Sequence, residues 1–263
     1  MKLSVVGGGN LGSAIALGYR EANPTAIIAV SQPLVDEIKY LEKFGITTTS
    51  SNSQGVDGAD VVIIAVKPRI LEPVLNDIKD CLRTKIVVSV VAGRSLSEIE
   101  RLLGAGPTLF RAMPNIAIAQ RQSITCIAHH NVTDEQRATV ETLFKQLGEI
   151  VFVDERMMDA CTVMAGSGIA FALRYIRAAM LAGIQLGFDQ RTSLNIVNQA
   201  MIGATAMLNA SGEHPEQLID RVATPKGCTI AGLNRMENEG FSASVISGVQ
   251  QSVEALEGMK QQG

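Results

Sequence analysis

Three glycines near the amino terminus could hold the pyrophosphate of a dinucleotide. Gly7, Gly9 and Gly12 have the spacing G-x-G-x-x-G within the segment VVGGGNLGSA, between a strand-like apolar run and a helical pattern. In such a loop the first glycine permits a tight turn, the second lets the backbone approach the pyrophosphate, and the third lets helix pack against strand. A helix start at Asn10 and Leu11 would add unpaired N–H groups that favour phosphate oxygens. This context favours cofactor binding over the alternative, a purely structural turn.

The end of the second strand pattern indicates which dinucleotide would bind. An NAD site usually carries Asp or Glu about 20 residues past the glycines, where the ribose hydroxyls lie. This chain has Ser31 and Gln32 at that point. No carboxylate would repel a 2′-phosphate, and two neutral donors could bind one, although the usual arginine is missing. The sequence therefore favours NADP, with NADPH the preferred donor and NADH the alternative.

The composition argues against several other classes of protein. The 263 residues are 46% hydrophobic and 19% charged, with a net charge of −3 and a pI near 5.7, so we expect a compact protein that binds no nucleic acid. No uninterrupted run approaches the roughly 20 apolar residues of a membrane span, and the most apolar segment, 160–173, is expected to be a buried helix. The four cysteines show no metal-ligand spacing, which predicts no metal site and free thiols in a reducing cytoplasm. His129 and His130 are expected to be solvated loop residues.

The first part of the chain alternates strands with helices, and the rest is helical. Strands are predicted at Lys2–Val6, Ala26–Val30, Asp60–Val66, Lys85–Val91, Thr108–Phe110, Ser123–Ala128 and Ile150–Val153. Helices are predicted at Leu11–Ala22, Leu34–Phe44, Arg69–Leu82, Ser95–Leu103, Asp134–Leu147, Arg156–Leu186, Gln190–Ser211, Pro215–Val222, Thr229–Glu239 and Ser242–Gln262. This order predicts an α/β fold: a doubly wound, mostly parallel Rossmann domain over residues 1–154, then an all-α domain over residues 155–263. Small residues along the later helices indicate close packing, within one chain or between two.

Six motifs occur in an order that resembles the pyrroline-5-carboxylate reductase family over nearly the whole chain. They are GGGNLGSA, AVKP (65–68), SVVAG (89–93), FRAMPN (110–115), AGSGIAF (165–171) and ATPKGCTIAGL (223–233). The resemblance implies reduction of the C=N bond of 1-pyrroline-5-carboxylate to L-proline by hydride from NAD(P)H, the last step of proline biosynthesis. It also implies a homodimer interlocked through the carboxyl-terminal helices, or a larger ring.

The resemblance also assigns site residues. On the cofactor side it implies Ala65, Val66, Lys67, Pro68 and Asn115; the substrate carboxylate would bind backbone N–H groups of the loop made by Pro225, Lys226, Gly227, Cys228 and Thr229. Thr229 matches the threonine whose hydroxyl contacts the imine nitrogen, which makes it the catalytic candidate. Plainer alternatives stay open: Lys67 as an ordinary strand-end charge, Asn115 as a turn residue and Thr229 as a helix N-cap.

The chain departs from the family pattern at three places near the expected pocket. Lys226 replaces a glycine, Ile116 and Ala117 stand in place of Thr-Pro, and Ile169 replaces a proline. Lysine would strain the loop by roughly 1 kcal/mol if that position needs a positive φ; otherwise its cation could assist binding. Two alternative functions follow: an NADP-dependent reductase of another cyclic imine or keto acid, and a non-catalytic NADP-binding redox sensor.

Overall fold

The computed structural model describes residues 1–261, which form two compact units. The sheet unit comprises residues 1–167 together with the carboxyl-terminal segment from Ser252, and the helical unit comprises Gly168–Gln251. The predicted division into a domain of residues 1–154 and a domain of residues 155–263 stays a prediction. Residues 262 and 263, the last two of the second domain, lie outside the described part of the chain.

The sheet unit is built on one eight-stranded sheet with the order β3-β2-β1-β4-β5-β6-β7-β8. Its strands are β1 (Lys2–Val6), β2 (Ile27–Ser31), β3 (Thr47–Thr49), β4 (Val61–Ile64), β5 (Ile86–Ser89), β6 (Thr108–Met113), β7 (Ser123–His129) and β8 (Gly148–Phe152). All neighbours pair in parallel except β6 and β7. The predicted fold class is therefore confirmed.

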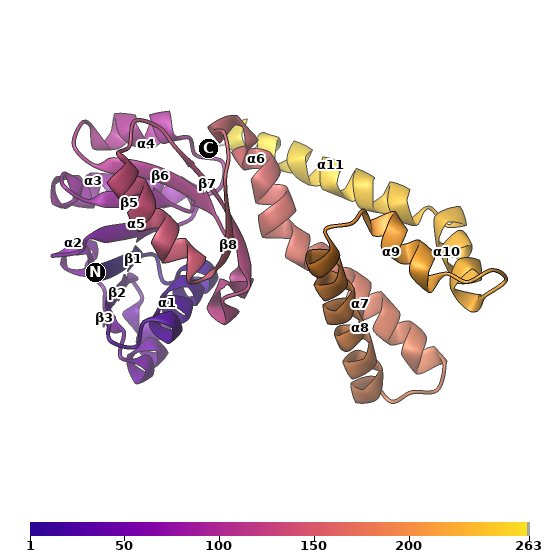
Figure 1. Ribbon diagram of the computed structural model, residues 1–263. Helices are drawn as coiled ribbons and strands as arrows, with labels where there is room; N and C mark the ends of the chain where they lie inside the picture. The colour runs from indigo at the N-terminus through magenta and orange to yellow at the C-terminus, as the bar shows by residue number, and fades with distance from the viewer. Residues whose placement is uncertain (262–263) are drawn as a thin grey trace. The chain divides into compact units, whose positions relative to one another are not determined.

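Helices cover both faces of this sheet (Figure 1). They are α1 (Asn10–Ala22), the 3₁₀ helix η1 (Val35–Phe44), α2 (Asn52–Val56), α3 (Leu71–Leu82), α4 (Leu96–Leu103) and α5 (Asp134–Lys145). Strand β4 shows why two covers are needed: Val61 and Ile63 pack in the core with α1, η1 and α5, whereas Val62 and Ile64 pack in the core with α2, α3 and α4. Side chains alternate along a strand, so a strand apolar at every position must be buried on both faces.

Several local predictions need correction. The strand β3 and the helix α2 were not expected, and residues 35–44 form a 3₁₀ helix rather than an α-helix. His129 is not a solvated loop residue: it ends β7, half-buried, with its ring edge-on to Phe110 and Phe152 at centroid distances of 5.4 and 5.7 Å. Burial and the nearby charge of Arg137 lower the pKa of His129. The neighbouring His130 is exposed, as expected.

The chain leaves the sheet through one long helical stretch that contains a π-helical segment. It consists of η4 (Glu155–Met157), α6 (Met158–Cys161), the π segment η5 (Thr162–Ser167) and α7 (Gly168–Gln185). The helical unit continues with α8 (Gln190–Ser211), α9 (Pro215–Val222), α10 (Cys228–Asn238) and α11 (Phe241–Gln261). The residues of α11 from Ser252 onward are assigned to the sheet unit. The predicted bounds of α8 and α9 are confirmed residue for residue; Gln262, the predicted last residue of the final helix, lies outside the described residues.

Small residues bring α7 and α8 together within one chain. Ser193 is buried and its hydroxyl donates to the carbonyl oxygen of Met180 at 2.7 Å. A Cβ at Gly183 would lie 2.1 Å from the Ser193 hydroxyl oxygen. The expectation of close helix packing is met here by a glycine facing a serine.

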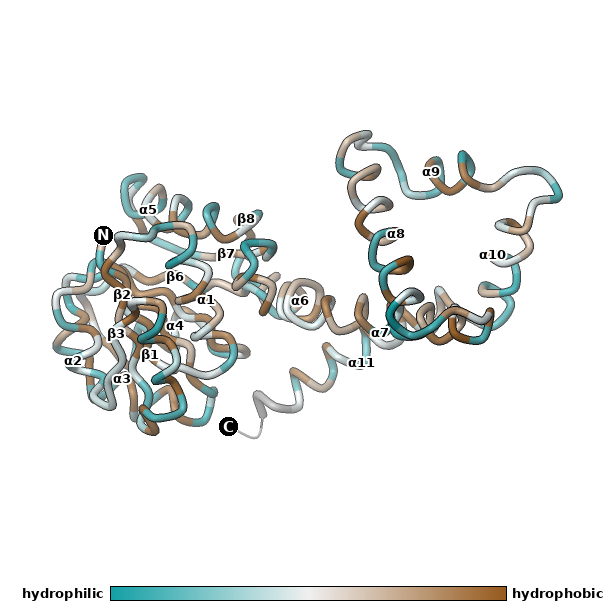
Figure 2. Tube along the Cα trace, turned by 90° about the horizontal axis from the view of Figure 1, so that it is seen from below, coloured by the Kyte–Doolittle hydropathy of each residue, from teal (hydrophilic) through white to brown (hydrophobic). Residues whose placement is uncertain are grey.

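The helical unit otherwise has little interior of its own. Among its described residues only Met180, Ser193 and Leu218 are buried, while hydrophobic residues, brown in Figure 2, recur along its helices. Leu186 is 81% exposed and Ile246 59%. The segment 160–173 was expected to be buried, but its second half, with Leu173 55% exposed, is not covered by this chain. By length and composition alone, the stretch Glu155–Gln185 could also cross a membrane.

Candidate functional site

The glycine loop has the conformation that its three glycine positions require. Gly7 has φ +103°, and a Cβ there would lie 2.5 Å from the carbonyl oxygen of Ala65. A Cβ at Gly12 would lie 1.9 Å from the carbonyl oxygen of Gly7. By contrast, a Cβ at Gly9 would meet no atom within 4 Å. Two glycines therefore serve the packing of the loop, and the third leaves an open face to a ligand.

Backbone donors at the start of α1 come directly after that open position in the chain. Gly9 is the N-cap of α1 and supplies no side-chain cap; the first turn holds no acidic residue. The first N–H groups of a helix have no intrahelical acceptor, so those of the residues after Gly9, which include Asn10 and Leu11, are available to an anion. Gln32 steadies the loop, because its side-chain oxygen accepts the N–H of Gly8 at 3.1 Å.

The side chain of Ser31 is engaged elsewhere. Ser31 is fully buried at the end of β2, and its hydroxyl donates to the side-chain oxygen of Asn52 at 2.9 Å. Asn52 begins α2, whose N-cap Ser51 accepts the N–H of Gln54. Asn52 is thus a further candidate residue for binding the ribose end of a dinucleotide, and the sequence alone did not reveal it. The Ser-x-x-Gln spacing at 51–54 is a helix-start signal that could have revealed it.

The segment after β4 lies beside the glycine loop. Strands β1 and β4 are neighbours, with Val6 opposite Ile64, and the strand order reverses between them. Such a reversal is where ligands bind in doubly wound sheets. The N–H of Ala65 donates to the carbonyl oxygen of Val6 at 2.8 Å. Ala65 and Val66 are half-buried, Lys67 is exposed, and Pro68 occupies the first turn of the 3₁₀ helix η2 (Pro68–Ile70).

Asn115 is held at both ends of its side chain. Its oxygen accepts the N–H of Ala117 at 3.0 Å and caps the 3₁₀ helix η3 (Ile116–Gln120), while its amide donates to the carbonyl oxygen of Ala165 at 3.0 Å. Ala165 lies in the π segment, a kind of helix often found at functional sites. The proline common in the resembled family at position 117 has no N–H to donate. The capping bond therefore depends on Ala117, and one amide hydrogen of Asn115 remains for a ligand.

A buried arginine fastens the start of the long helix to the sheet. The side chain of Arg111 on β6 is 4% exposed and lies 3.4 Å from a carboxylate oxygen of Glu155 and 3.5 Å from one of Asp159. The same Glu155 oxygen accepts the N–H of Leu96 at 2.6 Å.

Two buried thiols, Cys126 on β7 and Cys161 on α6, hydrogen-bond to each other. Burial, above all, raises the pKa of Cys126 to about 12, so this thiol stays protonated at neutral pH.

In the helical unit, the loop before α10 is a tight turn with lysine in a glycine-type conformation. The N–H of Gly227 donates to the carbonyl oxygen of Thr224 at 2.9 Å, and Lys226 has φ +61°. With Pro225 at the second position, this turn requires a positive φ at its third residue, where glycine or asparagine is usual. The left-handed conformation costs a lysine about 1 kcal/mol. Of the two outcomes considered for Lys226, the strained one is found.

The candidate catalytic residue Thr229 is not a helix cap. Gly227 is the N-cap of α10, and Cys228 and Thr229 are its first two residues. Thr229 is half-buried, and no hydrogen bond of its hydroxyl is found in the described part of the chain. The N-cap alternative is therefore wrong, and the hydroxyl is available to a substrate. Cys228 is an exposed free thiol, and no group of three metal-ligating side chains occurs among the described residues.

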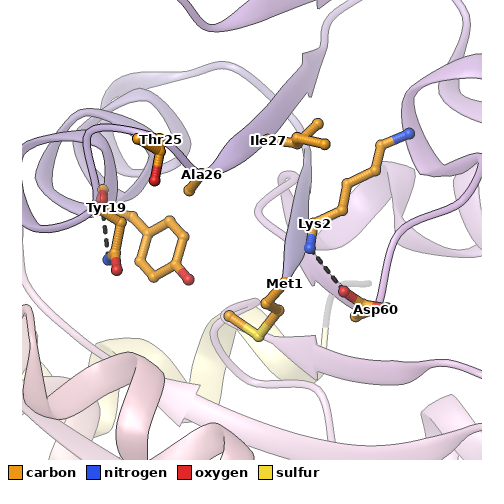
Figure 3. A pocket seen from close by; sticks show the side chains of 8 residues that line it. Met1, Lys2, Tyr19, Thr25, Ala26, Ile27 and Asp60 are labelled. Atoms are coloured by element: carbon orange, nitrogen blue, oxygen red, sulfur yellow. Dashed lines mark hydrogen bonds between the residues drawn. The ribbon is translucent and has the colours of Figure 1, made fainter.

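A separate hollow of about 430 Å³ lies at the amino-terminal ends of β1 and β2, far along these strands from the glycine loop. Figure 3 shows Lys2 and Asp60 among the residues that line it; the backbone N–H of Lys2 donates to the Asp60 carboxylate at 2.7 Å. Burial, with the charge of Asp60, raises the pKa of Tyr19. Ligands of doubly wound folds bind at the opposite, carboxyl ends of the strands, so this hollow is not the candidate site.

Two family models match the chain. One described as pyrroline-5-carboxylate reductase dimerisation matches residues 155–259. One described as NADP oxidoreductase coenzyme F420-dependent matches residues 2–93. The first covers the whole helical unit, and the second covers the glycine loop and the segment after β4.

Relatives match over nearly the whole chain. Pyrroline-5-carboxylate reductase of Aquifex aeolicus is 33% identical over 247 residues, covering 94% of this chain and 92% of the relative. Pyrroline-5-carboxylate reductase 1 of Dictyostelium discoideum is 36% identical, and the chain spans about half of its length, 48%. The crystal structure of Plasmodium falciparum pyrroline carboxylate reductase with NADP bound has a TM-score of 0.90 at 28% identity, covering 99% of this chain and 98% of that one.

Proposed function

The chain belongs to the pyrroline-5-carboxylate reductase family, and from this premise we propose that it reduces the C=N bond of 1-pyrroline-5-carboxylate to L-proline with NADPH. The observation that carries the proposal is the glycine loop at the point where the strand order reverses, in a chain whose relatives of similar length bear that name. The test is oxidation of NADPH by the purified chain when pyrroline-5-carboxylate is added. Well-folded protein without that activity would contradict the proposal.

The residues of the sheet unit fit a dinucleotide. Gly9 leaves an open face beside the unpaired N–H groups of α1, and Gln32, Ala65, Val66, Lys67 and Pro68 lie at neighbouring strand ends. When bound, the nicotinamide supplies the hydride. The chain's own contribution is to grip the diphosphate through backbone donors and to fix the dinucleotide's orientation, because a protonated imine is already electrophilic and needs chiefly positioning.

The residues of the helical unit fit the substrate. The unpaired N–H groups at the start of α10, behind the turn of Pro225, Lys226 and Gly227, would hold the substrate carboxylate. The Thr229 hydroxyl lies in the first turn of that helix and would hydrogen-bond the imine nitrogen. It would orient the ring and deliver or hold the proton at that nitrogen.

Removing this hydroxyl tests the assignment. We expect Thr229→Ala to lower kcat/KM for pyrroline-5-carboxylate about tenfold or more, in line with the loss of one positioned proton donor. NADPH affinity should stay unchanged, and Thr229→Ser should restore most of the activity. Equal turnover in the alanine variant and the unchanged protein would remove Thr229 from the chemistry. A redox sensor that only binds NADP would show no turnover to lose.

Coenzyme preference is a separate proposal. The end of β2 carries Ser31 and Gln32 and no carboxylate, and a solved relative binds NADP. We expect a lower KM for NADPH than for NADH, measured with the same imine. A clear preference for NADH would contradict this. Activity with another cyclic imine or keto acid, and none with pyrroline-5-carboxylate, would favour the alternative substrate.

A second copy of the chain is proposed to cover the apolar helices. Their exposed side chains, such as Leu186 and Ile246, form more apolar surface than a monomer usually leaves in water. The matching family model describes dimerisation over residues 155–259, which favours a homodimer, alone or within a larger ring, over a lipid-bound helix. Sedimentation should give at least a dimer without detergent, and a monomer would contradict the proposal.

A cytoplasmic location accords with four free cysteines.

A further inference from the structure

Lys226 has a backbone conformation that is unfavourable for lysine. Only three described residues other than glycine have a positive φ, and Lys226 is one of them. Glycine would take the same turn without steric cost. A strained residue that persists without a structural reason is a marker of function.

The charge of Lys226 is also badly placed for stability. Lys226 directly precedes Gly227, the N-cap of α10, and the helix dipole is positive at that end. The side chain is exposed, and no ion pair of Lys226 is found among the described residues. Ion pairs of this unit instead join Arg221 to Glu213 and Arg235 to Glu239. The lysine thus adds a cation to a helix end that already favours anions.

An anion bound at the start of α10 would give both the strained backbone and the positive charge of Lys226 a role in binding. Its charge would be attracted by the ammonium and by the unpaired N–H groups at the same time. The turn fixes the backbone of Lys226 directly before those donors, so its side chain can reach a ligand there. Lys226 is also the only lysine between residues 168 and 251, so no neighbouring lysine in this unit could replace it.

We propose that Lys226 is a specificity-determining residue that makes this chain select cyclic imines bearing a carboxylate over uncharged cyclic imines. This inference rests on the proposed function, which places the carboxylate at the start of α10. It adds that a side-chain cation, in addition to the backbone donors, recognises the acid.

Steady-state kinetics of the full chain with two substrates tests the inference. For pyrroline-5-carboxylate, we expect Lys226→Gln and Lys226→Gly to raise KM about three- to tenfold with a much smaller change in kcat, because one ion pair is lost. For 1-pyrroline, which lacks the carboxylate, KM should stay the same. Lys226→Arg should keep the low KM for the acid. The matched control Arg191→Gln removes one exposed positive charge from α8 and should leave both KM values unaltered.

Two further measurements separate charge from backbone. High salt should shrink the difference between the unchanged protein and Lys226→Gln, because salt screens exposed charges. Without ligand, Lys226→Gly should unfold at a temperature about 2 °C higher, because glycine relieves the strained φ. An equal KM for the acid in Lys226→Gln and the unchanged protein would overturn the inference. So would an equal rise for both substrates.

Failure of the inference differs from failure of the proposed function. If the unchanged protein turns over pyrroline-5-carboxylate and Lys226→Gln has the same KM, the reaction stands and the inference is wrong. If the unchanged protein shows no turnover, calorimetry with L-proline and NADP⁺ decides the inference: weaker binding of L-proline by Lys226→Gln supports it, and equal or absent binding overturns it.

Discussion

Gly12→Ala is expected to destabilise the chain by about 3 kcal/mol and to abolish tight NADPH binding. The new Cβ would lie 1.9 Å from the carbonyl oxygen of Gly7. That atom belongs to the backbone of the loop, so neither side can yield by rotating a side chain. The start of α1 would have to move away from β1, and the N–H groups meant for the diphosphate would move with it. Urea denaturation and NADPH titration measure the two effects.

Gly9→Ala is the matched control, because it adds the same methyl group to the same loop. Gly9 has φ −67°, which alanine adopts freely, and its Cβ would meet nothing within 4 Å. We expect a stability loss of at most about 1 kcal/mol, the cost of alanine at an N-cap, together with a KM for NADPH raised about tenfold or more. If Gly9→Ala binds NADPH normally, the diphosphate does not approach this position. If Gly12→Ala keeps its stability, the contact between loop and helix is not tight.

The sequence predicts well those parts of the fold that depend on local patterns. Strands such as β4 are apolar at every position, and the capping box of Thr133 and Gln136 marks the start of α5. The family inferred from six motifs is confirmed by the comparisons, and the mostly parallel sheet is confirmed by the structure. The elements that the sequence does not predict are short, or they depend on contacts with other parts of the chain. Strand β3 has three residues and α2 has five, too few for a periodic pattern.

Contacts between distant residues could not be predicted from the sequence. Asn115 and Ala165 are joined across 50 positions, and Ser31 meets Asn52 across 21. No local pattern encodes these pairs. The side chains of two predicted cofactor residues, Asn115 and Ser31, are therefore engaged within the chain in a way that the sequence did not reveal. The positive φ of Lys226 was recognised only as one of two outcomes, because a lysine by itself does not predict it. Whether the predicted site residues bind their ligands stays a prediction.

Arg111→Ala is expected to lower the free energy of unfolding by about 3–5 kcal/mol, the usual effect of breaking a buried ion pair from one side. Arg111 is the most buried member of a group in which the side chains of Glu155 and Asp159 are 25% and 31% exposed. Removing the guanidinium leaves two carboxylates facing a cavity in the sheet. Urea denaturation measures the loss, at one fixed protein concentration because the stability of an oligomer depends on it.

Arg83→Ala provides the contrast for this prediction. Its guanidinium pairs with Asp80 at 3.0 Å, but the two side chains are 69% and 75% exposed, so we expect a loss below about 1 kcal/mol. Equal losses in the two variants would show that the Arg111 group does not fasten the helix to the sheet. A large loss confined to Arg111→Ala would show that residues 155–159 depend on a buried cation. The same variant should then weaken the nearby link between Asn115 and Ala165, lowering kcat/KM in the protein that remains folded.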